Sequence, residues 1–567
     1  NVAAEMFSPI LDSYLGRGKL QVSQAEGVEN WDTEYYSKKE DSLAEAKKTS
    51  NKVSQQVCEE GIVLLKNNGV LPLAEKTEVT PFGYGYLNPA YAGTGAAASA
   101  DNSMVTVEEG LQNYFTVNKA AVKKMESAEA EYPDAAEGTS ALDADQNSLQ
   151  AMTNGGEAQK IYGYKADIYQ GIENEIKNTT GIVFINRNGS EGIDKRYEAY
   201  EDGTPHYLAL TQNEKDTISY VKQNCASCVI VLNTSNPMEL TPIMEGEYEA
   251  DAILWMGTAG SRGFEALGRI LCGQVNPSGR LSDIYASDFT KDPTYMNFGE
   301  YTYTNSKVDD STILDFIPGA NKGNMDRKFV EYEEGIYIGY RYYEKKGIQP
   351  AYPFGYGLSY TSFEYEHLTV SEENDHTIVT VDVTNTGDVA AKHVVELFIE
   401  PKMKTRLPRP VRELKAFKKI FLQPGEKKQV CFSLEGRDFA YYDPKVKDWV
   451  IENGAYAIEI CHDSMNVAVS AEITKSGEKY LVPLDYDCGF YEMFQYPEVK
   501  KMFYEFLVEQ GLVTADQVND NLEKGIIWSF WAVRSYLDMN SNGLISFEAY
   551  NRFIDKANEV IRKMKAK

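Results

Sequence analysis

The sequence predicts a layered α/β sandwich domain with a mostly parallel sheet, followed by an all-β sandwich and a small α-helical domain. Short apolar runs alternate with helical patterns over residues 61–271, which is typical of strand–helix–strand units. Segments of period-two alternation begin near residue 364, and helix-length segments fill the end of the chain. The 567 residues suffice for three or four domains of typical size.

We expect the α/β domain over residues 40–360, after an N-terminal extension of residues 1–39. Residues 40–60 have a helical pattern. Thr211 and Glu214 have the spacing of a capping box, which predicts a helix start at that point. The remaining elements are short buried-type runs: strands are predicted at Gly61–Leu65, Thr80–Gly83, Gly181–Ile185, Val229–Leu232 and Ala252–Trp255, and helices over Thr211–Gln223 and Gly263–Leu271.

The second domain, residues 361–475, has the short strands and turn spacing of an immunoglobulin or fibronectin III-like sandwich. Its strands are predicted at Thr377–Val383, Val394–Ile399, Gln429–Ser433 and Ala455–Ile460. The third, residues 476–567, is predicted to be helical over Val499–Gln510, Ala515–Lys524, Ser529–Leu537 and Phe547–Met564.

Charge and composition restrict the partners of the chain. The net charge of −28 disfavours nucleic acid and anionic lipid, while neutral substrates such as sugars are compatible with it. No apolar run is long enough to cross a membrane. The sequence begins with Asn1 instead of Met, so we expect a signal peptide or anchor outside it and an extracellular or cell-surface location. The sequence leaves a homo-oligomer open.

One carboxylate has a favourable place for chemistry. Glu191 stands between glycines in a loop that follows the apolar run Gly181–Ile185. Loops that leave the carboxyl ends of parallel strands are where open α/β sheets bind their ligands. A solvated loop acid remains the alternative reading of Glu191 on this observation alone.

Several separated motifs resemble glycoside hydrolase family 3. The stretch Gly61–Leu73 resembles the beginning of that family's second domain, and Asn276–Leu281, Tyr337–Tyr343 and Tyr352–Tyr360 are similar to later motifs in it. Val383–Gly387 and Glu452–Tyr456 resemble its fibronectin type III-like domain. The resemblance implies a retaining β-glycosidase of β-glucosidase type, which hydrolyses terminal β-linked sugars and requires no cofactor.

The resemblance also implies roles for individual residues. The stretch Arg187–Arg196 is similar to the family loop that carries the general acid/base, and this role falls on Glu191. Retaining glycosidases need a carboxyl group that is protonated when the leaving oxygen departs and ionised when water attacks. Arg187, Asp194 and Arg196 are the implied substrate contacts, although an additional Lys195 separates the last two.

The nucleophile half of such an enzyme has no match in this sequence. In the family a (β/α)8 barrel of about 250 residues carries the nucleophile and a Lys-His pair. The one Lys-His dipeptide here is Lys392-His393, which we expect to be a surface pair on a sandwich strand. We therefore expect a barrel domain or subunit elsewhere. The alternative is a non-catalytic, cell-surface protein that binds carbohydrate or serves as a scaffold.

The helical tail contains part of a calcium-binding loop. Asp538, Asn540, Asn542 and Leu544 occupy ligand positions of an EF-hand-like loop, residues 538–549, with Gly543 at its turn. The twelfth position should be a bidentate Glu, but it is Ala549. The sequence therefore allows Ca²⁺ binding or a degenerate loop that is retained for its turn.

Overall fold

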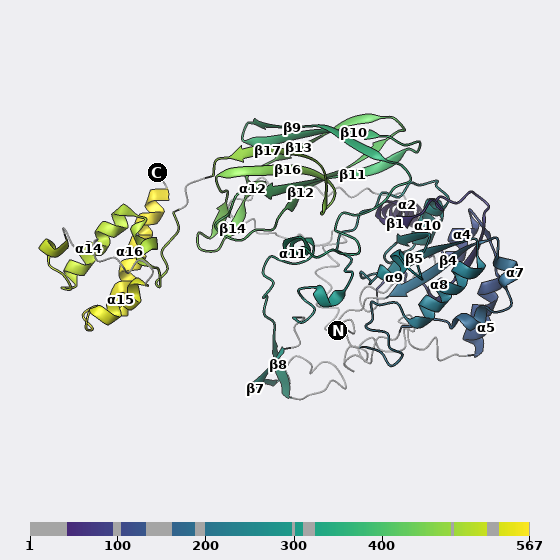
Figure 1. The fold of residues 1–567 in the computed structure, drawn as a ribbon, viewed down its shortest axis with the longest axis horizontal. Helices are drawn as coiled ribbons and strands as arrows, with labels where there is room; N and C mark the ends of the chain where they lie inside the picture. Colours follow the sequence, from purple (N-terminus) through teal and green to yellow (C-terminus); the bar gives the residue numbers. More distant parts are fainter. Residues whose placement is uncertain are drawn as a thin grey trace. The chain divides into compact units, whose positions relative to one another are not determined.

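The computed structural model describes residues 42–93, 104–131, 161–187, 199–297, 301–309, 324–477, 481–518 and 532–565. The description begins just before helix α2 (Leu43–Gly61), and from Val53 onward the described residues belong to one compact unit. Figure 1 shows the elements that follow in chain order: an α/β region, a β-sandwich and a group of helices. Among the described helices, none combines the length and apolarity needed to span a bilayer.

The α/β region is built on a six-stranded sheet with the order β1-β6-β5-β4-β2-β3. Only β1 runs antiparallel to its neighbour, β6, and all other pairs are parallel. The predicted mostly parallel sheet is therefore confirmed. Its strands are β1 (Val63–Asn67), β2 (Glu78–Phe82), β3 (Thr116–Val117), β4 (Thr180–Arg187), β5 (Ser227–Thr234) and β6 (Ala252–Trp255).

Helix α8 (Gln212–Asn224) packs on β4 and β5, at the centre of the sheet. The predicted capping box starts it, since the Glu214 amide donates to Thr211 Oγ1 at 3.2 Å and Glu214 Oε2 accepts from the Thr211 amide at 2.9 Å. The other described helices of the region are α3 (Tyr84–Leu87), α4 (Val107–Gln112), α5 (Ala120–Glu131), η3 (Ala166–Tyr169), α7 (Glu173–Ile176), α9 (Thr241–Met244), α10 (Gly263–Leu271), η4 (Phe289–Lys291) and α11 (Tyr340–Lys346).

The β-sandwich pairs a three-stranded sheet, β13-β10-β9, with a four-stranded sheet, β12-β11-β16-β17. Strand β10 alternates between buried and half-buried residues, as expected for a strand with one face in the core. The strands are β9 (Phe363–Glu373), β10 (His376–Asn385), β11 (Ala391–Pro401), β12 (Glu413–Leu422), β13 (Lys427–Leu434), β16 (Gly454–Asp463) and β17 (Asn466–Lys475), with a small hairpin of β14 (Tyr441–Asp443) and β15 (Asp448–Val450) and the short helix α12 (Gly436–Phe439).

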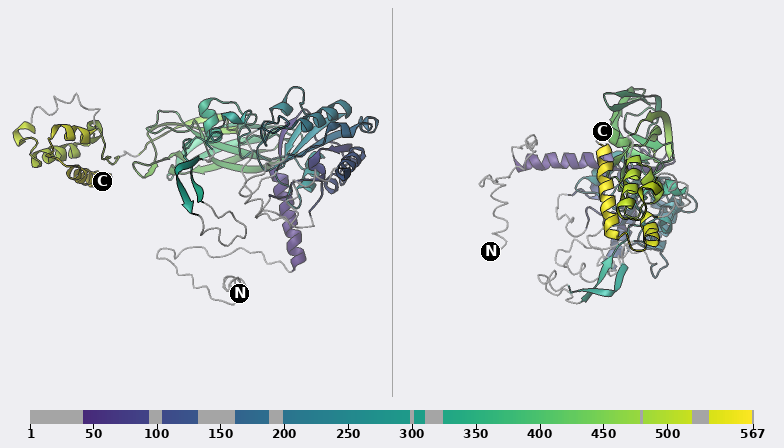
Figure 2. Two further views of the ribbon diagram at one scale, coloured as in Figure 1. Left: turned by 90° about the horizontal axis from the view of Figure 1, so that it is seen from below. Right: turned by 90° about the vertical axis from the view of Figure 1, so that its left-hand side faces the viewer.

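The remaining elements are a hairpin and the helical tail. Strands β7 (Tyr301–Asp309) and β8 (Asn324–Phe329) form a separate two-stranded sheet, which Figure 1 labels and Figure 2 draws from two further directions. The tail packs around its own aromatic core, which includes Phe503 and Phe553. Its helices are α13 (Phe490–Phe494), α14 (Pro497–Glu509), η5 (Ala515–Val518), α15 (Val533–Asn540) and α16 (Phe547–Lys565).

Candidate active site at the carboxyl end of the sheet

The candidate site begins where β4 ends. β2 and β4 run parallel in adjacent positions, so their carboxyl ends lie at the same edge of the sheet. Arg187 is the last residue of β4, and the description of the chain resumes at Ala199. Glu191, Asp194 and Arg196, the other predicted site residues, lie outside the described residues. The site is therefore built here from the residues that flank them.

Arg187 is completely enclosed by the protein, with a side chain that is 1% exposed. Its Nη1 and Nη2 donate to the two carboxylate oxygens of Glu214 at 2.7 and 2.8 Å, which is a bidentate ion pair. The remaining donors bond to backbone carbonyls: Nε to Tyr207 at 2.8 Å, Nη2 to Ala209 at 2.8 Å and Nη1 to Asn186 at 2.7 Å. Burial alone would lower the pKa of Arg187, but the Glu214 carboxylate raises it above its ordinary value.

This geometry differs from the sugar contact predicted for Arg187. A guanidinium group has five N–H donors, and all five of Arg187 are used within the protein. No donor is left for a substrate hydroxyl in this arrangement, so the direct contact of Arg187 with a sugar stays a prediction that would require one of these bonds to break. Sequence reasoning found Glu214 as a helix cap and missed its pairing with Arg187, because a contact over 27 positions leaves no local pattern.

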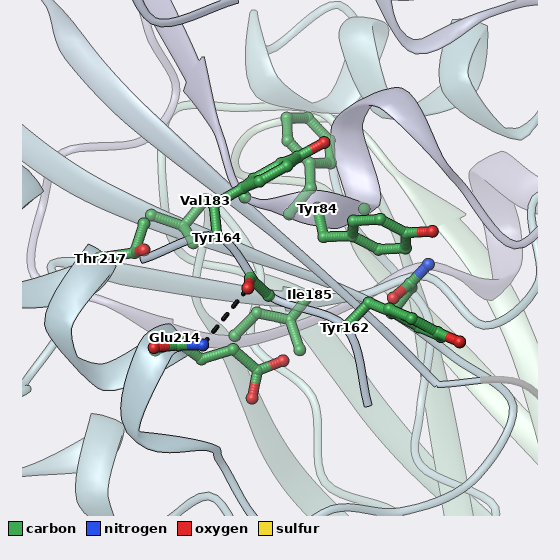
Figure 3. A pocket seen from close by; sticks show the side chains of 13 residues that line it. Tyr84, Tyr162, Tyr164, Val183, Ile185, Glu214 and Thr217 are labelled. Carbon is green, nitrogen blue, oxygen red and sulfur yellow. Dashed lines mark hydrogen bonds between the residues drawn. The ribbon is translucent and has the colours of Figure 1, made fainter. Parts of the chain in front are cut away.

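A small pocket lies beside this ion pair, with a volume of about 10 Å³, which is room for about one water molecule. Figure 3 shows Tyr84, Tyr162 and Tyr164 around it, with Val183 and Ile185 of β4 and with Glu214 at the start of α8. The rings of Tyr84 and Tyr162 stack with centroids 5.4 Å apart. Tyr84 is 5% and Tyr164 is 9% exposed, so both rings belong to the core of the α/β region, and Tyr162 is the partly exposed ring of the three.

Glycine gives the turn after β2 its close approach to β4. A Cβ on Gly83 would lie 2.6 Å from the Phe184 carbonyl oxygen, and one on Gly85 would lie 2.9 Å from it. Gly83 also has a positive φ of 89°, which other residues rarely adopt. These two glycines therefore allow Tyr84 to reach the pocket. Sequence reasoning did not identify this wall of the site.

The described residues offer little for a metal ion. They contain no group of three or more His, Cys, Asp or Glu side chains that could hold one. In the calcium-type loop, α15 continues through Asn540, whose side-chain amide donates to the Tyr536 carbonyl at 2.8 Å. Asn542 and Gly543 adopt φ values of 47° and 79°, which form the turn. Ca²⁺ binding by this loop stays a prediction of the sequence.

Neither position twelve of that loop nor the acidic residue before it supplies the missing bidentate carboxylate. Position twelve is Ala549, which is partly buried against the core of the tail. Glu548 Oε2 lies 4.0 Å from Arg552 Nη1, one helical turn further along α16. A bidentate carboxylate at position twelve is what an EF-hand requires. The donor set formed by Asp538, Asn540, Asn542 and the Leu544 carbonyl is thus incomplete.

The Lys-His dipeptide is only partly a surface pair. Lys392 is half-exposed and pairs with Glu60, but His393 is 4% exposed, so the prediction of a surface pair is wrong for the histidine. His393 Nε2 lies 2.6 Å from the Tyr365 hydroxyl, and its Nδ1 lies 3.3 Å from Arg280 Nη2. Burial, with the positive charge of Arg280, lowers the pKa of His393 well below its usual value. It therefore belongs to a buried junction and not to a sugar site.

Comparison with known proteins gives two family matches. Residues 62–360 match the glycosyl hydrolase family 3 C-terminal domain, and residues 393–464 match the fibronectin type III-like domain. The chain is 30% identical over 441 residues to thermostable beta-glucosidase B of Acetivibrio thermocellus, covering 75% of this chain and 48% of that protein. It is 36% identical over 257 residues to an exo-alpha-(1->6)-L-arabinopyranosidase of Bifidobacterium longum, covering 45% of this chain and 30% of that protein.

Solved structures give the same picture. Beta-glucosidase 3B from Thermotoga neapolitana in complex with glucose is similar with a TM-score of 0.61 and 26% identity, over 76% of this chain and 55% of that one. A GH3 beta-glucosidase from Bifidobacterium adolescentis is similar with a TM-score of 0.59 and 26% identity, over 80% and 58% of the two chains. The chain spans about half the length of the Acetivibrio, Thermotoga and Bifidobacterium adolescentis enzymes. A (β/α)8 barrel is not among the domains that the described residues form.

Proposed function

Because the chain belongs to glycoside hydrolase family 3, we propose that it is the acid/base component of a retaining β-glycosidase of β-glucosidase type. The observation that carries the proposal is the family match over residues 62–360, within which the Glu191 motif directly follows the central strand β4. The relatives' names support β-glucosides as the substrate class. The nucleophile is supplied by a (β/α)8 barrel domain or partner chain.

The proposed reaction assigns one proton to Glu191. Its carboxyl group protonates the glycosidic oxygen as the bond to the leaving group breaks, and the barrel carboxylate forms a glycosyl–enzyme intermediate. Glu191, now ionised, then removes a proton from the water that hydrolyses this intermediate. Retention of configuration requires the two carboxyl groups to be about 5–5.5 Å apart, which places the barrel nucleophile directly beside the Glu191 loop.

The test uses the native assembly, purified from its own host through an affinity tag on this chain. Its intact mass identifies a barrel partner, a longer chain or a homo-oligomer. Aryl β-glucosides are then assayed with the wild type and with Glu191→Gln. We expect turnover of phenyl β-glucoside to fall by roughly 10²–10⁴-fold in the variant. With 2,4-dinitrophenyl β-glucoside, whose leaving group departs without a proton, the glycosyl–enzyme still forms, so azide, which needs no general base, should restore turnover of the variant and yield β-glucosyl azide.

Glu201→Gln is the matched control. Glu201 is an exposed acid shortly after the same loop, and we expect its variant to keep the wild-type rate. Unchanged turnover in Glu191→Gln would remove that residue from the role. If the native assembly hydrolyses none of the aryl glycosides, the enzymatic proposal as a whole is wrong.

The second candidate is a non-catalytic protein that binds carbohydrate or serves as a scaffold at the cell surface. An assembly that binds β-glucosides without hydrolysing them would support it. We further propose an extracellular or cell-surface location for either function, which surface labelling of intact cells would test.

A further inference from the structure

Two exposed aromatic side chains lie next to each other on the small hairpin of the sandwich. Tyr442 on β14 and Trp449 on β15 are 49% and 42% exposed. They are cross-strand partners in the register of the hairpin, and their ring centroids are 5.7 Å apart. No other large hydrophobic side chain of residues 422–466, all of which the structure describes, is as exposed. The two rings therefore form an isolated surface, which we call the aromatic platform.

The opposite face of the hairpin fixes the platform in place. Asp443 and Val450, which follow the two aromatic residues in the sequence, are completely buried. The Asp443 carboxylate accepts from the Lys445 amide at 2.9 Å and from the Val446 amide at 3.3 Å, so the turn between the strands is held as well. A binding surface that is rigid before its ligand arrives loses little conformational freedom on binding. The backbone that carries the platform is thus fixed, while both rings remain partly exposed.

Arg437 borders the platform from the neighbouring helix α12. Its guanidinium carbon lies 3.2 Å from the centre of the Trp449 ring, which is a stacked arrangement. Helix α12 is held by a capping box, in which the Glu435 amide donates to the Asp438 carboxylate at 2.8 Å. Figure 1 shows α12 and β14 at the same end of the sandwich. Because a guanidinium group carries its N–H donors around its own rim, hydrogen-bond donors lie beside the aromatic surface.

Charged groups of both signs surround the rings. Lys447 and Asp448 directly precede Trp449, and both are exposed. The Asp448 carboxylate accepts from the Trp449 amide at 2.8 Å, which keeps an acceptor next to the platform. Together with Arg437, these residues supply donors and an acceptor at its border. An aromatic surface with such a border fits a ligand that is apolar on its faces and polar around its rim.

A β-linked glucose ring has this chemistry. Its hydroxyl groups are equatorial, so its C–H groups form two apolar faces and its hydroxyls lie around the rim. Other ligand classes fit less well. A stable protein interface buries about 800 Å² on each partner, which is far more than two rings provide. The net charge of −28 disfavours nucleic acid and anionic lipid.

We propose that the aromatic platform of Tyr442 and Trp449 is a binding site for β-linked gluco-oligosaccharides, which stack on the rings and hydrogen-bond to Arg437 and Asp448. The choice of β-linked glucose rests on the proposed function, whereas the stacking requires only a sugar with an apolar face. Glu191 plays no part in this site. The platform therefore holds longer glucan chains and leaves the hydrolysis of a small glycoside unchanged.

The test is titration calorimetry of the native assembly with cellopentaose, laminaripentaose and, as an α-linked comparison, maltopentaose. Saturating isofagomine, a cationic glucose mimic, is present to occupy the active site and to prevent hydrolysis. We expect a β-linked pentasaccharide to bind and Trp449→Ala to weaken that binding by at least about 10-fold. Tyr442→Ala should also weaken it. Trp449→Phe keeps an aromatic ring and should stay within about 3-fold of the wild type.

Phe421→Ala is the matched control. Phe421 is a 44% exposed aromatic side chain on β12, outside the platform, and its loss should leave binding unchanged. Equal weakening in Phe421→Ala and Trp449→Ala would overturn the inference, and so would equally tight binding of maltopentaose. A change in the mass of the assembly in Trp449→Ala would show that the platform is a protein interface instead, which also overturns it.

Hydrolysis of phenyl β-glucoside tests the proposed function separately, and Trp449→Ala should leave its rate unchanged. If the assembly binds β-linked pentasaccharides through Trp449 but hydrolyses no glycoside, this inference stands and the proposed function fails. If the assembly hydrolyses phenyl β-glucoside but binds no pentasaccharide while isofagomine occupies the active site, the proposed function stands and this inference fails.

Discussion

A carboxyl group at the junction of the α/β region and the sandwich should make the chain less stable as pH rises through neutrality. Glu396 on β11 is 5% exposed, and its Oε2 has no hydrogen-bond partner among the described residues. A Cβ added to Gly355 would lie 2.3 Å from that oxygen, so the carboxyl group lies directly against the backbone. Burial raises the pKa of Glu396 to about 7, with a further rise from Asp463 and an opposing effect of Arg280.

The sign and size of the effect follow from proton binding. Below pH 4.5 Glu396 is protonated in both the folded and the unfolded chain, so its ionisation does not change the free energy of unfolding. Between pH 4.5 and about 7 the unfolded chain releases the proton and the folded chain keeps it, so the free energy of unfolding decreases with rising pH. The difference between 4.5 and about 7 corresponds to about 3 kcal/mol, all of it lost above pH 7.

The perturbation is Glu396→Gln, which keeps the shape and removes the titration. The free energy of unfolding is measured in urea between pH 4.5 and 8, and hydrogen exchange of peptides from β11 is used as the probe of local stability. We expect the variant to match the wild type at pH 4.5 and to exceed it by up to about 3 kcal/mol at pH 8. Glu366→Gln is the control, since the Glu366 side chain on the neighbouring sheet is 41% exposed and pairs with Lys427 at 2.6 Å. A difference between Glu396→Gln and wild type that stays constant with pH would refute the reasoning.

Two further predictions concern backbone packing and the tail. Gly279→Ala should cost about 1–3 kcal/mol in thermal unfolding, because its Cβ would lie 2.4 Å from the Ile62 carbonyl oxygen. Gly61→Ala, with no atom within 4 Å of the added Cβ, should stay within about 0.5 kcal/mol of the wild type, and an equal loss in both would contradict the packing argument. Saturating Ca²⁺ should leave the melting temperature of the tail unchanged, since Ala549 supplies no carboxylate. A rise that Asp538→Ala abolishes would instead establish a calcium site.

The sequence predicted those elements best whose ends are marked locally. The strand at Ala252–Trp255 and the helix at Gly263–Leu271 have the predicted bounds, because both are continuous buried runs with clear breaks. The helix after Thr211 also begins where its capping box predicts. The direction of β1 was not predictable. The apolar pattern of β1 is compatible with either a parallel or an antiparallel pair, and the structure shows that β1 is antiparallel to β6.

Contacts between distant segments account for what the sequence did not show. Lys392-His393 has the alternation of an ordinary strand, and nothing local indicates that Arg280 and Tyr365 enclose the histidine. Likewise Glu214 has a complete local explanation as a capping residue, so its sequence context gives no reason to seek a second partner. Both errors concern residues that have a local role and a contact with a distant segment. The local sequence pattern indicates only the first of these.

The motifs that identify the family lie mostly at a domain junction. Arg280, from the stretch Asn276–Leu281, donates to the Gly357 carbonyl of the stretch Tyr352–Tyr360 and contacts His393 of the sandwich. The Ser464 amide, at the end of β16, donates to the Phe354 carbonyl in that same stretch at 2.8 Å. These contacts hold the α/β region against the sandwich, and they would serve an active enzyme and a non-catalytic relative equally. The choice between those two functions therefore depends on Glu191, whose substitution the aryl glucoside assay tests.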